Sequence, residues 1–306
     1  MKSYQGVPQN TIVTEHHSIK SFIEKDKKSS VDNNIDWKTV ESFGDEWAIF
    51  SSFEEKEIKR IGDQYFDIID DRIIDENSYV LDVGCGTGRW TRYISDKVGF
   101  VEAIDPSSAV VQASHMLKDK KNVRITQAEV DHIPFEDGSF DLVFSLGVLH
   151  HIPDTKAGIK KCVEKVKPGG RFMVYLYYNL DNRSVFFKGI FYFSNIIRFV
   201  VSSLPKTIKR AFSDLLAILL YLPFISLAKF LNKFSLTRGI VKFIPLSYYR
   251  DKSFTVIRND SLDRFGTPIE HRFSKKQIEL MLKEAGLTDI RFSDNEPYWH
   301  AVGKKK

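Results

Sequence analysis

Short blocks of apolar residues alternate with amphipathic stretches between residues 79 and 177. The apolar blocks have the length and composition of strands, whereas apolar residues in the intervening stretches recur every three or four positions, as in helices. Strands are therefore predicted at 79–83, 100–104, 123–128, 140–145 and 171–177, and helices from residue 89 onward, at 109–117 and at 154–166. Strands that alternate with helices in this way predict an α/β fold with a mostly parallel sheet.

The pattern continues less regularly toward both ends of the chain. A helix is predicted at 58–74, and residues up to about Ser30 are polar, which predicts a solvated linker around 24–30. In the C-terminal part, Ser274 and Gln277 have the spacing of a capping box, and Gly286 suits a helix end. Two final strands are predicted at 287–292 and 298–302.

Three glycines, Gly84, Gly86 and Gly88, follow the first of the regular strands directly. Glycines allow the backbone to turn sharply and a ligand to approach closely. Asp105 ends the next strand, 21 positions after Gly84, a spacing that suits a carboxylate binding both hydroxyls of a ribose. A glycine turn without a ligand is the alternative, but the pair predicts a cofactor with a ribose, such as NAD or S-adenosylmethionine.

The residues around the glycines favour S-adenosylmethionine. A dinucleotide site needs a third glycine three positions after Gly86, and this chain has Arg89 there. Asp82 directly precedes the glycines, where a carboxylate repels a pyrophosphate but can hold an amino-acid ammonium group.

Four ordered segments resemble the class I S-adenosylmethionine-dependent methyltransferases of the methyltransferase 11 type. They are LDVGCGTG at 81–88, IDPS at 104–107, EVDHIPFEDGSFDLVFSLGVLHHIPD at 129–154 and KPGGRFMV at 167–174, and the tail HRFSKKQIELMLKEAGL is similar to the same family. The resemblance implies a Rossmann-like sheet of seven strands, six parallel and one antiparallel, with helices on both faces. The cofactor-binding residues expected from it and from the motifs are Asp82, Gly84, Cys85, Gly86, Gly88, Asp105, Pro106, Gln127, Ala128, Glu129 and Ser145.

Two histidines, His150 and His151, follow the fourth strand, at the sheet edge where ligands bind in open α/β folds. An imidazole is basic near pH 7, so either residue can deprotonate a hydroxyl group. His150 is the stronger candidate for a general base, and the alternative is that it orients the loop by hydrogen bonds, the role that we favour for His151. Tyr177 is a weaker catalytic candidate on the same rim, and Arg250, Arg264, His271 and Arg272 could reach the acceptor from farther along the chain.

Composition limits the class of protein. The chain has 306 residues, of which 42% are hydrophobic and 28% charged, as in a soluble globular protein. Two cysteines give neither a disulfide framework nor the spacing of a metal site, so we expect no metal and a cytoplasmic location. The first ten residues lack an apolar core, and we expect no secretory signal.

The charge is distributed unevenly. Residues 183–252 contain 12 Lys or Arg against two acids, a net of +10, so the remainder of the +5 chain carries −5. We therefore expect three parts: a polar N-terminal segment and lead-in at 1–45, an S-adenosylmethionine-binding methyltransferase domain at 46–182 and 253–306, and a basic, aromatic-rich helical insertion at 183–252. In the lead-in, Phe43, Trp47 and Phe50 are spaced for one helical face, which either covers the cofactor or anchors the segment.

The insertion has three interpretations. Its longest uncharged run, 215–228, has 14 residues and contains Pro223, whereas a membrane-spanning helix needs about 20, so no spanning segment is expected. A helical lid or a homodimer contact is favoured, and the alternative is peripheral contact with the inner face of a membrane, because lysines flank the apolar run. Nucleic acid is not expected, because the cations are interleaved with aliphatic residues.

These observations together predict a methyltransferase that transfers a methyl group from S-adenosylmethionine to a small or lipid-like acceptor. Two alternatives stay open: a nicotinamide-dependent dehydrogenase, and a non-catalytic partner protein that keeps the cofactor-binding fold. Cofactor titration and turnover separate the three.

Overall fold

The computed structural model describes residues 2–24, 34–49, 53–70, 72–181, 185–241 and 243–306. The chain divides into two compact units, Met1–Asp181 with Ile269–Lys306, and Asn182–Pro268. The second unit ends 16 residues beyond the predicted insertion, because helix α10 (Phe254–Gly266) packs against helices α6 (Val185–Ser202) and α7 (Lys206–Leu216). Phe50, the predicted linker after Glu24 and the side chains of Phe186 and Phe187 lie outside the described residues.

The described part of the first unit contains one nine-stranded sheet in the order β1-β2-β5-β4-β3-β6-β7-β9-β8. The strands are β1 Asn10–Val13, β2 Ser18–Ser21, β3 Tyr79–Val83, β4 Phe100–Asp105, β5 Val123–Gln127, β6 Phe140–Leu146, β7 Val166–Tyr175, β8 Leu287–Phe292 and β9 His300–Lys305. Only β1 and β9 run against their neighbours in this sheet; every other pairing among these strands is parallel. Mostly parallel pairing with one antiparallel strand near the C-terminal edge agrees with the predicted Rossmann-like fold.

The predicted number of seven strands is wrong, because an N-terminal hairpin adds two more. β2 pairs in parallel with the edge strand β5, and the Ser21 hydroxyl donates a hydrogen bond of 2.7 Å to Gln127. Ile19 of β2 is fully buried, and the ring of Tyr4 stacks on Phe135. The sequence did not predict this hairpin, because each strand has only four residues, too few for a clear alternating pattern.

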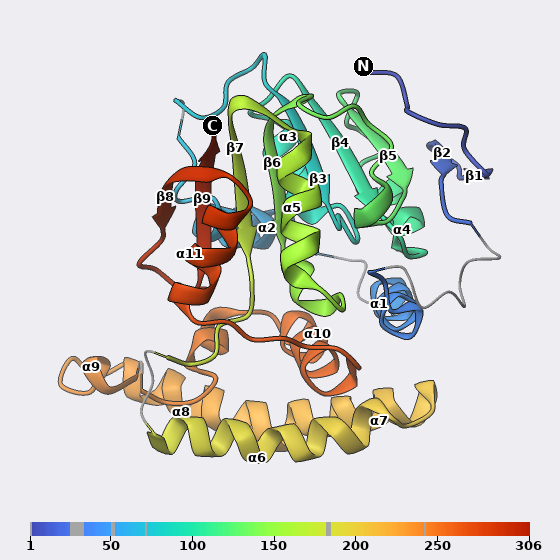
Figure 1. Cartoon of the computed structure of the whole chain (residues 1–306). Coiled ribbons are helices and arrows are strands. Elements are labelled where there is room, and N and C mark those ends of the chain that lie inside the picture. The colour runs from blue at the N-terminus through green and yellow to red at the C-terminus, as the bar shows by residue number, and fades with distance from the viewer. Residues whose placement is uncertain (1, 25–33, 50–52, 71, 182–184, 242) are drawn as a thin grey trace. The chain divides into compact units, whose positions relative to one another are not determined.

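Helices cover both faces of the sheet (Figure 1). Adjacent strand residues point to opposite faces: Val80 packs in one buried cluster and Leu81 in the other. The first cluster includes α2 Glu55–Tyr65, α3 Arg89–Ser95 and α4 Ala109–Met116; the second includes α5 Thr155–Lys165 and α11 Lys275–Glu284. Helix α1, Trp37–Ile49, contacts α4.

Most helix and strand boundaries predicted from the sequence lie within a few residues of those in the structure. The capping box at Ser274 and Gln277 is confirmed, since both reciprocal hydrogen bonds are present. The helix predicted at 58–74 is wrong at its C-terminal end: α2 stops at Tyr65, and Phe66 begins a series of turns. The strand predicted at 171–177 begins earlier than expected, because β7 starts at Val166 and passes through residues 168–170 with a shift in its register against β6.

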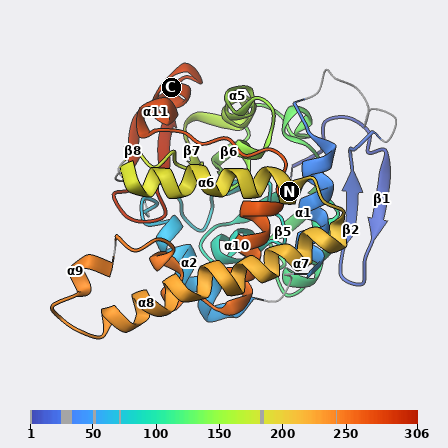
Figure 2. The same cartoon turned by 90° about the horizontal axis from the view of Figure 1, so that it is seen from below.

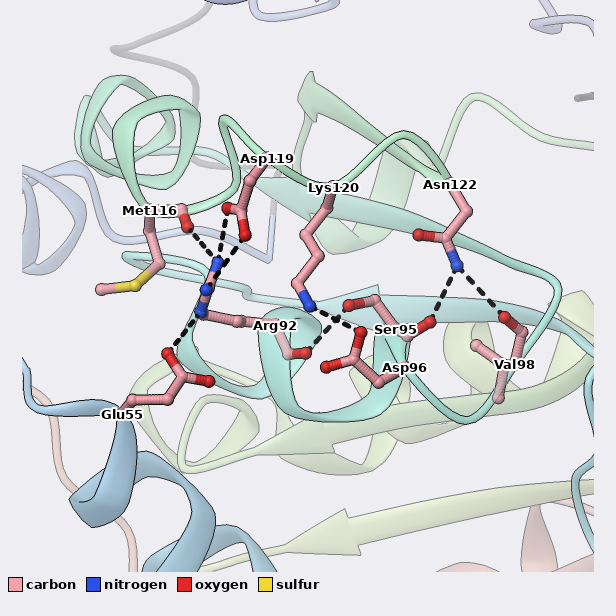
Figure 3. A network of polar contacts seen from close by, with 9 residues as sticks. All are labelled: Glu55, Arg92, Ser95, Asp96, Val98, Met116, Asp119, Lys120 and Asn122. Carbon is pink, nitrogen blue, oxygen red and sulfur yellow. Dashed lines mark hydrogen bonds and ion pairs between the residues drawn. The ribbon is translucent and has the colours of Figure 1, made fainter.

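A polar network holds the helix layer of α2, α3 and α4 together (Figure 3). Arg92 of α3 donates to Glu55 at 2.8 Å and to the two carboxylate oxygens of Asp119 at 2.7 and 3.1 Å. Its guanidinium also donates to the carbonyl of Met116 at 3.0 Å. The side chain of Arg92 is only 17% exposed, so one cation links three segments that are distant in sequence.

The second unit is helical in the part that the structure describes. After α6 and α7, a π-helical turn at Ala217–Tyr221 leads into α8 Leu222–Asn232, followed by α9 Arg238–Val241, the 3-10 turn η5 Ser247–Asp251 and α10. The core of the unit contains Val201, Ala217, Tyr221, Ile225, Ile257 and Phe265.

Helix α7, the π turn and α8 form one helical run, Lys206–Asn232. Pro223 lies inside this run, two residues after the end of the π turn, and does not end it. By length and composition alone, this 27-residue run is long and apolar enough to cross a membrane, and it is the one such helix in the described residues. No membrane-spanning segment was predicted from the sequence, because the uncharged part of the run, residues 215–228, is much shorter than the helix.

Candidate functional site

The glycine loop follows β3 as predicted, at the carboxyl end of the sheet. Gly84, Gly86 and Gly88 have φ values of +83°, +52° and +83°, a region that other residues enter only with strain. A Cβ at Gly84 would lie 2.5 Å from both methyl groups of Val148, so a side chain has no room there. The N–H groups of Gly84 and Cys85 donate to the carbonyl of Ile104 in β4, which fixes the loop against the neighbouring strand.

Asp105 connects the end of β4 to the glycine loop. One carboxylate oxygen accepts the N–H of Gly86 at 2.9 Å, and the other accepts the N–H and the hydroxyl of Ser107 at 2.8 and 2.6 Å. The carboxyl group is 8% exposed, and burial raises its pKa. Each carboxylate oxygen can accept more than one hydrogen bond, so Asp105 can also accept hydrogen bonds from the two hydroxyls of a ribose.

Asp82 lies in β3, two residues before the first glycine of the loop, and is nearly inaccessible to water. The hydroxyl of Thr91 donates to its carboxylate at 2.6 Å. Burial raises the pKa of Asp82 to about 7, and the charge of Asp105 adds to this effect, while the bond from Thr91 opposes it. A cationic group bound beside Asp82 would stabilise its ionised form.

The other predicted cofactor residues lie at the same edge of the sheet. Gln127 donates to the carbonyl of Pro106 at 3.2 Å, so the side chain expected at an adenine edge already bridges β5 and the end of β4. The Ser145 hydroxyl donates to the carbonyl of Val83 at 2.9 Å. Cys85 and Ala128 are buried, and Glu129 bonds His132 at 2.6 Å. All of them lie on the ends of β3 to β6 or on the turns that follow.

Arg89 directly follows the glycine loop but was not among the cofactor-binding residues predicted from the sequence. Its guanidinium carbon lies 4.8 Å from the ring centre of Trp47, 4.3 Å from Phe53 and 5.2 Å from Trp90. Burial lowers its pKa, and no ion pair with a carboxylate is found for it in the described part of the chain. A cation held by aromatic rings next to a ligand loop can bind an anionic group. The helical spacing of Trp47 was visible in the sequence, but its contact with Arg89 was not.

Helix α1 covers the glycine loop from outside. The indole nitrogen of Trp47 lies 3.3 Å from the position that a Cβ on Gly86 would occupy, and Gly44 packs against Ser108. Phe43 of the same helix packs its ring edge-on against His151, with centroids 4.8 Å apart. The lead-in residues Phe43 and Trp47 therefore contact both the loop and the histidine turn.

His150 is fully buried in the turn after β6. Neither ring nitrogen has a hydrogen-bond partner among the described residues. Its pKa lies well below the ordinary value, first because of burial and then because His151, Arg272 and His271 add positive charge nearby. His150 is therefore a neutral imidazole at pH 7, with a lone pair that can accept a proton.

His151 has a different environment. Its Nδ1 donates to the carbonyl of Ile269 at 2.7 Å, which fixes the tautomer and ties the turn to the segment before α11. The N–H of His271 in that segment donates to the carbonyl of His150 at 2.9 Å, and the N–H of Phe273 donates to Tyr177 at 2.8 Å. Residues from three distant parts of the sequence thus form one wall.

The structure brings some of the predicted acceptor residues together. Tyr177 stacks on His150, and the guanidinium of Arg272 lies 5.0 Å from the ring centre of Tyr177. Arg250 and Arg264 belong to the second unit, where Arg264 donates to Ser194 at 2.8 Å and Arg250 pairs with Asp251. His271 and Arg272 therefore remain candidates for acceptor contacts, and the other two arginines have partners within their own unit.

One group of side chains in the described residues has the spacing of a metal site: Glu15, His16 and His115, whose ligand atoms lie within 4.8 Å of one another. All three are exposed. They belong to the N-terminal hairpin and to α4, and none of them is among the residues of the glycine loop or the histidine turn.

About a third of the chain matches a known type of domain. Residues 81–174 match the family model described as "Methyltransferase domain", which confirms the resemblance found in the sequence. S-adenosylmethionine is the cofactor of this domain type.

Two curated relatives match the same region. Phosphoethanolamine N-methyltransferase 2 of Caenorhabditis elegans is 36% identical over 102 residues, which are 32% of this chain and 23% of the relative. Tocopherol O-methyltransferase, chloroplastic, of Arabidopsis thaliana is 38% identical over 103 residues, 31% of this chain and 29% of the relative. The chain spans less than a third of the length of either protein.

A solved structure of Haemonchus contortus phosphoethanolamine N-methyltransferase 2 in complex with S-adenosyl-L-methionine has a TM-score of 0.45 to this chain at 18% identity. The match covers 84% of this chain and 43% of that one.

Proposed function

We propose that the chain is an S-adenosylmethionine-dependent methyltransferase that acts on a small or lipid-like acceptor. The observation that carries the proposal is the pair of buried carboxylates, Asp82 and Asp105, on either side of a glycine loop within the matched methyltransferase segment. The two named relatives act on small molecules, phosphoethanolamine and tocopherol, which supports a small acceptor.

Each carboxylate has a distinct task in this proposal. S-adenosylmethionine supplies a methyl group on a sulfonium, which is reactive enough for direct displacement by an oxygen, nitrogen or carbon nucleophile. Asp105 binds the ribose hydroxyls, and Asp82 holds the ammonium group in ionised form. Gln127, Ala128 and Glu129 contact the adenine, and Arg89 is available for an anionic group.

The histidine turn forms the acceptor side of the proposed site. Burial lowers the pKa of His150 and keeps it neutral, and its ring nitrogens have no hydrogen-bond partner in the described part of the protein. In this proposal the hydroxyl of a bound acceptor donates to His150 and gives up its proton as the methyl group is transferred. His151 is held by Ile269 and positions the turn. Tyr177 and Arg272 complete the wall, and their packing keeps the His150 ring in place.

Isothermal titration with S-adenosylhomocysteine tests the cofactor assignment. We expect binding to the wild type, no comparable binding of NAD, and a loss of about 2–4 kcal/mol in Asp105→Ala, which removes two charge-assisted hydrogen bonds. Asp105→Asn is the matched variant, because it preserves the size of the side chain. Affinity for NAD equal to that for S-adenosylhomocysteine would favour the dehydrogenase.

Turnover with an acceptor tests the enzymatic part of the proposal. If His150 is the general base, His150→Ala lowers kcat by about 10²–10⁴-fold and leaves S-adenosylhomocysteine affinity nearly unchanged. His115→Ala, an exposed histidine on α4, is the control. An equal loss of cofactor affinity would assign His150 a structural role, and cofactor binding without turnover on any acceptor would support the non-catalytic alternative.

A further inference from the structure

Exposed large apolar side chains are concentrated in the second unit. Of 21 such residues found in the described chain, 18 lie between Val185 and Phe254. Ordinary protein surfaces carry single exposed apolar residues, whereas a contiguous group marks an interaction site. The concentration therefore requires a partner for this surface.

Helix α6 presents one apolar stripe to the outside. Tyr192, Ile196 and Phe199 are spaced by four and three residues, so they lie on one side of the helix, and they are 66%, 63% and 76% exposed. Phe193 and Val200 lie beside them and are 67% and 57% exposed. Arg198 is the one charged residue between Tyr192 and Val200, and its guanidinium donates to the carbonyls of Thr267 and Pro268 at 3.2 and 3.3 Å.

The run from α7 to α8 presents a second stripe. Phe212, Leu215, Leu219, Leu227 and Phe230 are spaced by three, four, eight and three residues, and each is between 47% and 64% exposed. Small and aromatic residues on the opposite side of the same helices, such as Ala217, Tyr221 and Ala228, are buried. We call the two stripes together the apolar face.

The inner side of these helices is tied to α10 by polar bonds. Asp214 pairs with Arg258 at 2.6 Å, and the Tyr221 hydroxyl donates to Asp260 at 2.7 Å. The Ser261 hydroxyl donates to the carbonyl of Ser213 at 2.7 Å. Figure 2 shows α6 and the α7–α8 run nearest the viewer, with α10 behind them.

The charge of the unit indicates the nature of the partner. Residues 182–268 contain 14 Lys or Arg and four acids, a net of +10. The acids are engaged within the unit: Asp214 by Arg258, Asp251 by Arg250, Asp260 by Tyr221 and Asp263 by Thr267. Arg210, Lys229 and Lys233 are exposed, and the described chain offers them no ion pair.

We propose that the apolar face binds the surface of an anionic lipid bilayer, with α6 and the α7–α8 run lying in the plane of the membrane. An apolar side bordered by cations is the pattern of helices that lie at the membrane–water interface. The aromatic residues Tyr192, Phe193 and Phe199 suit this depth. The proposal concerns the second unit alone and does not depend on the methyltransferase reaction.

Two other occupants fit the observations less well. The uncharged part of the α7–α8 run, 14 residues at about 1.5 Å each, spans about 21 Å, which is less than the hydrocarbon core of about 30 Å. A spanning helix would also leave Asp214 and Tyr221 without their α10 partners in lipid. A second copy of the chain would bring two units of +10 together, whereas an anionic surface neutralises this charge.

Vesicle co-sedimentation of the full chain, without cofactor, tests the proposal. We expect binding to vesicles of phosphatidylcholine with phosphatidylglycerol, weaker binding to phosphatidylcholine alone, and a decrease as salt rises through about 0.15 M, because salt screens the attraction. Phe199→Ser with Leu219→Ser should lower the partition coefficient by about tenfold or more. Lys229→Glu with Lys233→Glu should remove the preference for anionic lipid. Leu280→Ser is the matched control, since Leu280 is 56% exposed but belongs to α11 of the first unit.

The depth to which the apolar face inserts into the bilayer can be measured independently. The second unit contains no tryptophan, so Tyr192→Trp places a single probe on the apolar face of that unit. We expect a blue shift of its emission with vesicles, and stronger quenching by lipids brominated near the headgroup than by lipids brominated near the chain end. Unchanged unfolding temperature and S-adenosylhomocysteine affinity would verify that each variant is folded.

Three results would overturn the proposal. The first is no sedimentation of the wild type with strongly anionic vesicles at low salt. The second is resistance of the bound chain to alkaline carbonate, which would indicate a spanning helix. The third is a dimer in analytical ultracentrifugation that Phe199→Ser with Leu219→Ser dissociates, which would assign the apolar face to a second copy.

Discussion

The imidazole of His150 stacks on the ring of Tyr177, with centroids 3.9 Å apart and 29° between the ring planes. The two residues follow neighbouring strands, β6 and β7, so their contact depends on parallel pairing that brings the carboxyl ends of these strands to one edge. Burial in this contact holds His150 in its neutral form. The burial of His150 therefore affects the pH dependence of stability and the protonation state of the proposed base.

The first prediction concerns the pH dependence of stability. The pKa of His150 is depressed in the folded protein, so the folded state binds fewer protons than the unfolded state, and stability is lost as pH falls below the unfolded value of about 6.5. Replacing His150 with Phe removes one titrating group and should reduce this slope by up to about 1.4 kcal/mol per pH unit. Urea unfolding at several pH values between about 5.5 and 7.5 measures it. An unchanged slope in the variant would contradict a neutral, buried His150.

The second prediction concerns the pH dependence of cofactor affinity. Because the pKa of Asp82 is about 7 in the free protein, a bound ammonium group must displace its proton at lower pH. Affinity for S-adenosylhomocysteine should therefore fall as pH decreases below about 7, with proton release on binding, and should level off above it. Titration in buffers with different ionisation enthalpies measures the released proton. Asp82→Asn should bind more weakly and lose this pH dependence; equal wild-type affinity at low and high pH would refute the role.

A third prediction identifies the ligand of Arg89. We expect its guanidinium to bind the carboxylate of the cofactor's amino-acid part, since it follows the glycine loop directly and the described chain gives it no carboxylate partner. Arg89→Met keeps the apolar stem among the aromatic rings and should lower S-adenosylhomocysteine affinity by about 1.5–3 kcal/mol. Methylthioadenosine, which lacks the amino-acid part, should bind wild type and variant equally. A similar loss for both ligands would instead show that Arg89 supports the fold of the loop.

The fourth prediction concerns the stability of the helix layer. Arg92→Met removes the hydrogen bonds to Glu55, Asp119 and Met116 but preserves an apolar stem, and should lower the free energy of unfolding by about 1–3 kcal/mol. The value is modest because Glu55 and Asp119 are more than half exposed. Arg72→Met, which removes an exposed pair with Asp70, is the control and should leave the free energy of unfolding nearly unchanged. Equal effects of the two variants would show that the network adds nothing beyond a surface ion pair.

The local features of this protein were determined by the sequence itself. The strand at 79–83, the glycine turn and the capping box at Ser274 follow from periods of two and 3.6 residues and from backbone geometry, which a short segment specifies alone. The spacing of Gly84 and Asp105 likewise placed a carboxylate beside the loop, because parallel neighbours end at the same edge. The uneven charge of the second unit was also visible without coordinates.

Tertiary structure decided which surfaces are covered. Arg89 is enclosed by Trp47 and Phe53, which precede it by 42 and 36 positions, and no local pattern encodes such a contact. The hairpin that extends the sheet is stabilised by its pairing with β5 and not by its own short strands. Within the second unit, the bonds of Asp214 to Arg258 and of Tyr221 to Asp260 determine which side of the α7–α8 run faces α10, and the sequence alone did not show this. Periodicity defines the faces of a helix or strand, but the free energy of contacts between distant segments determines which face is buried.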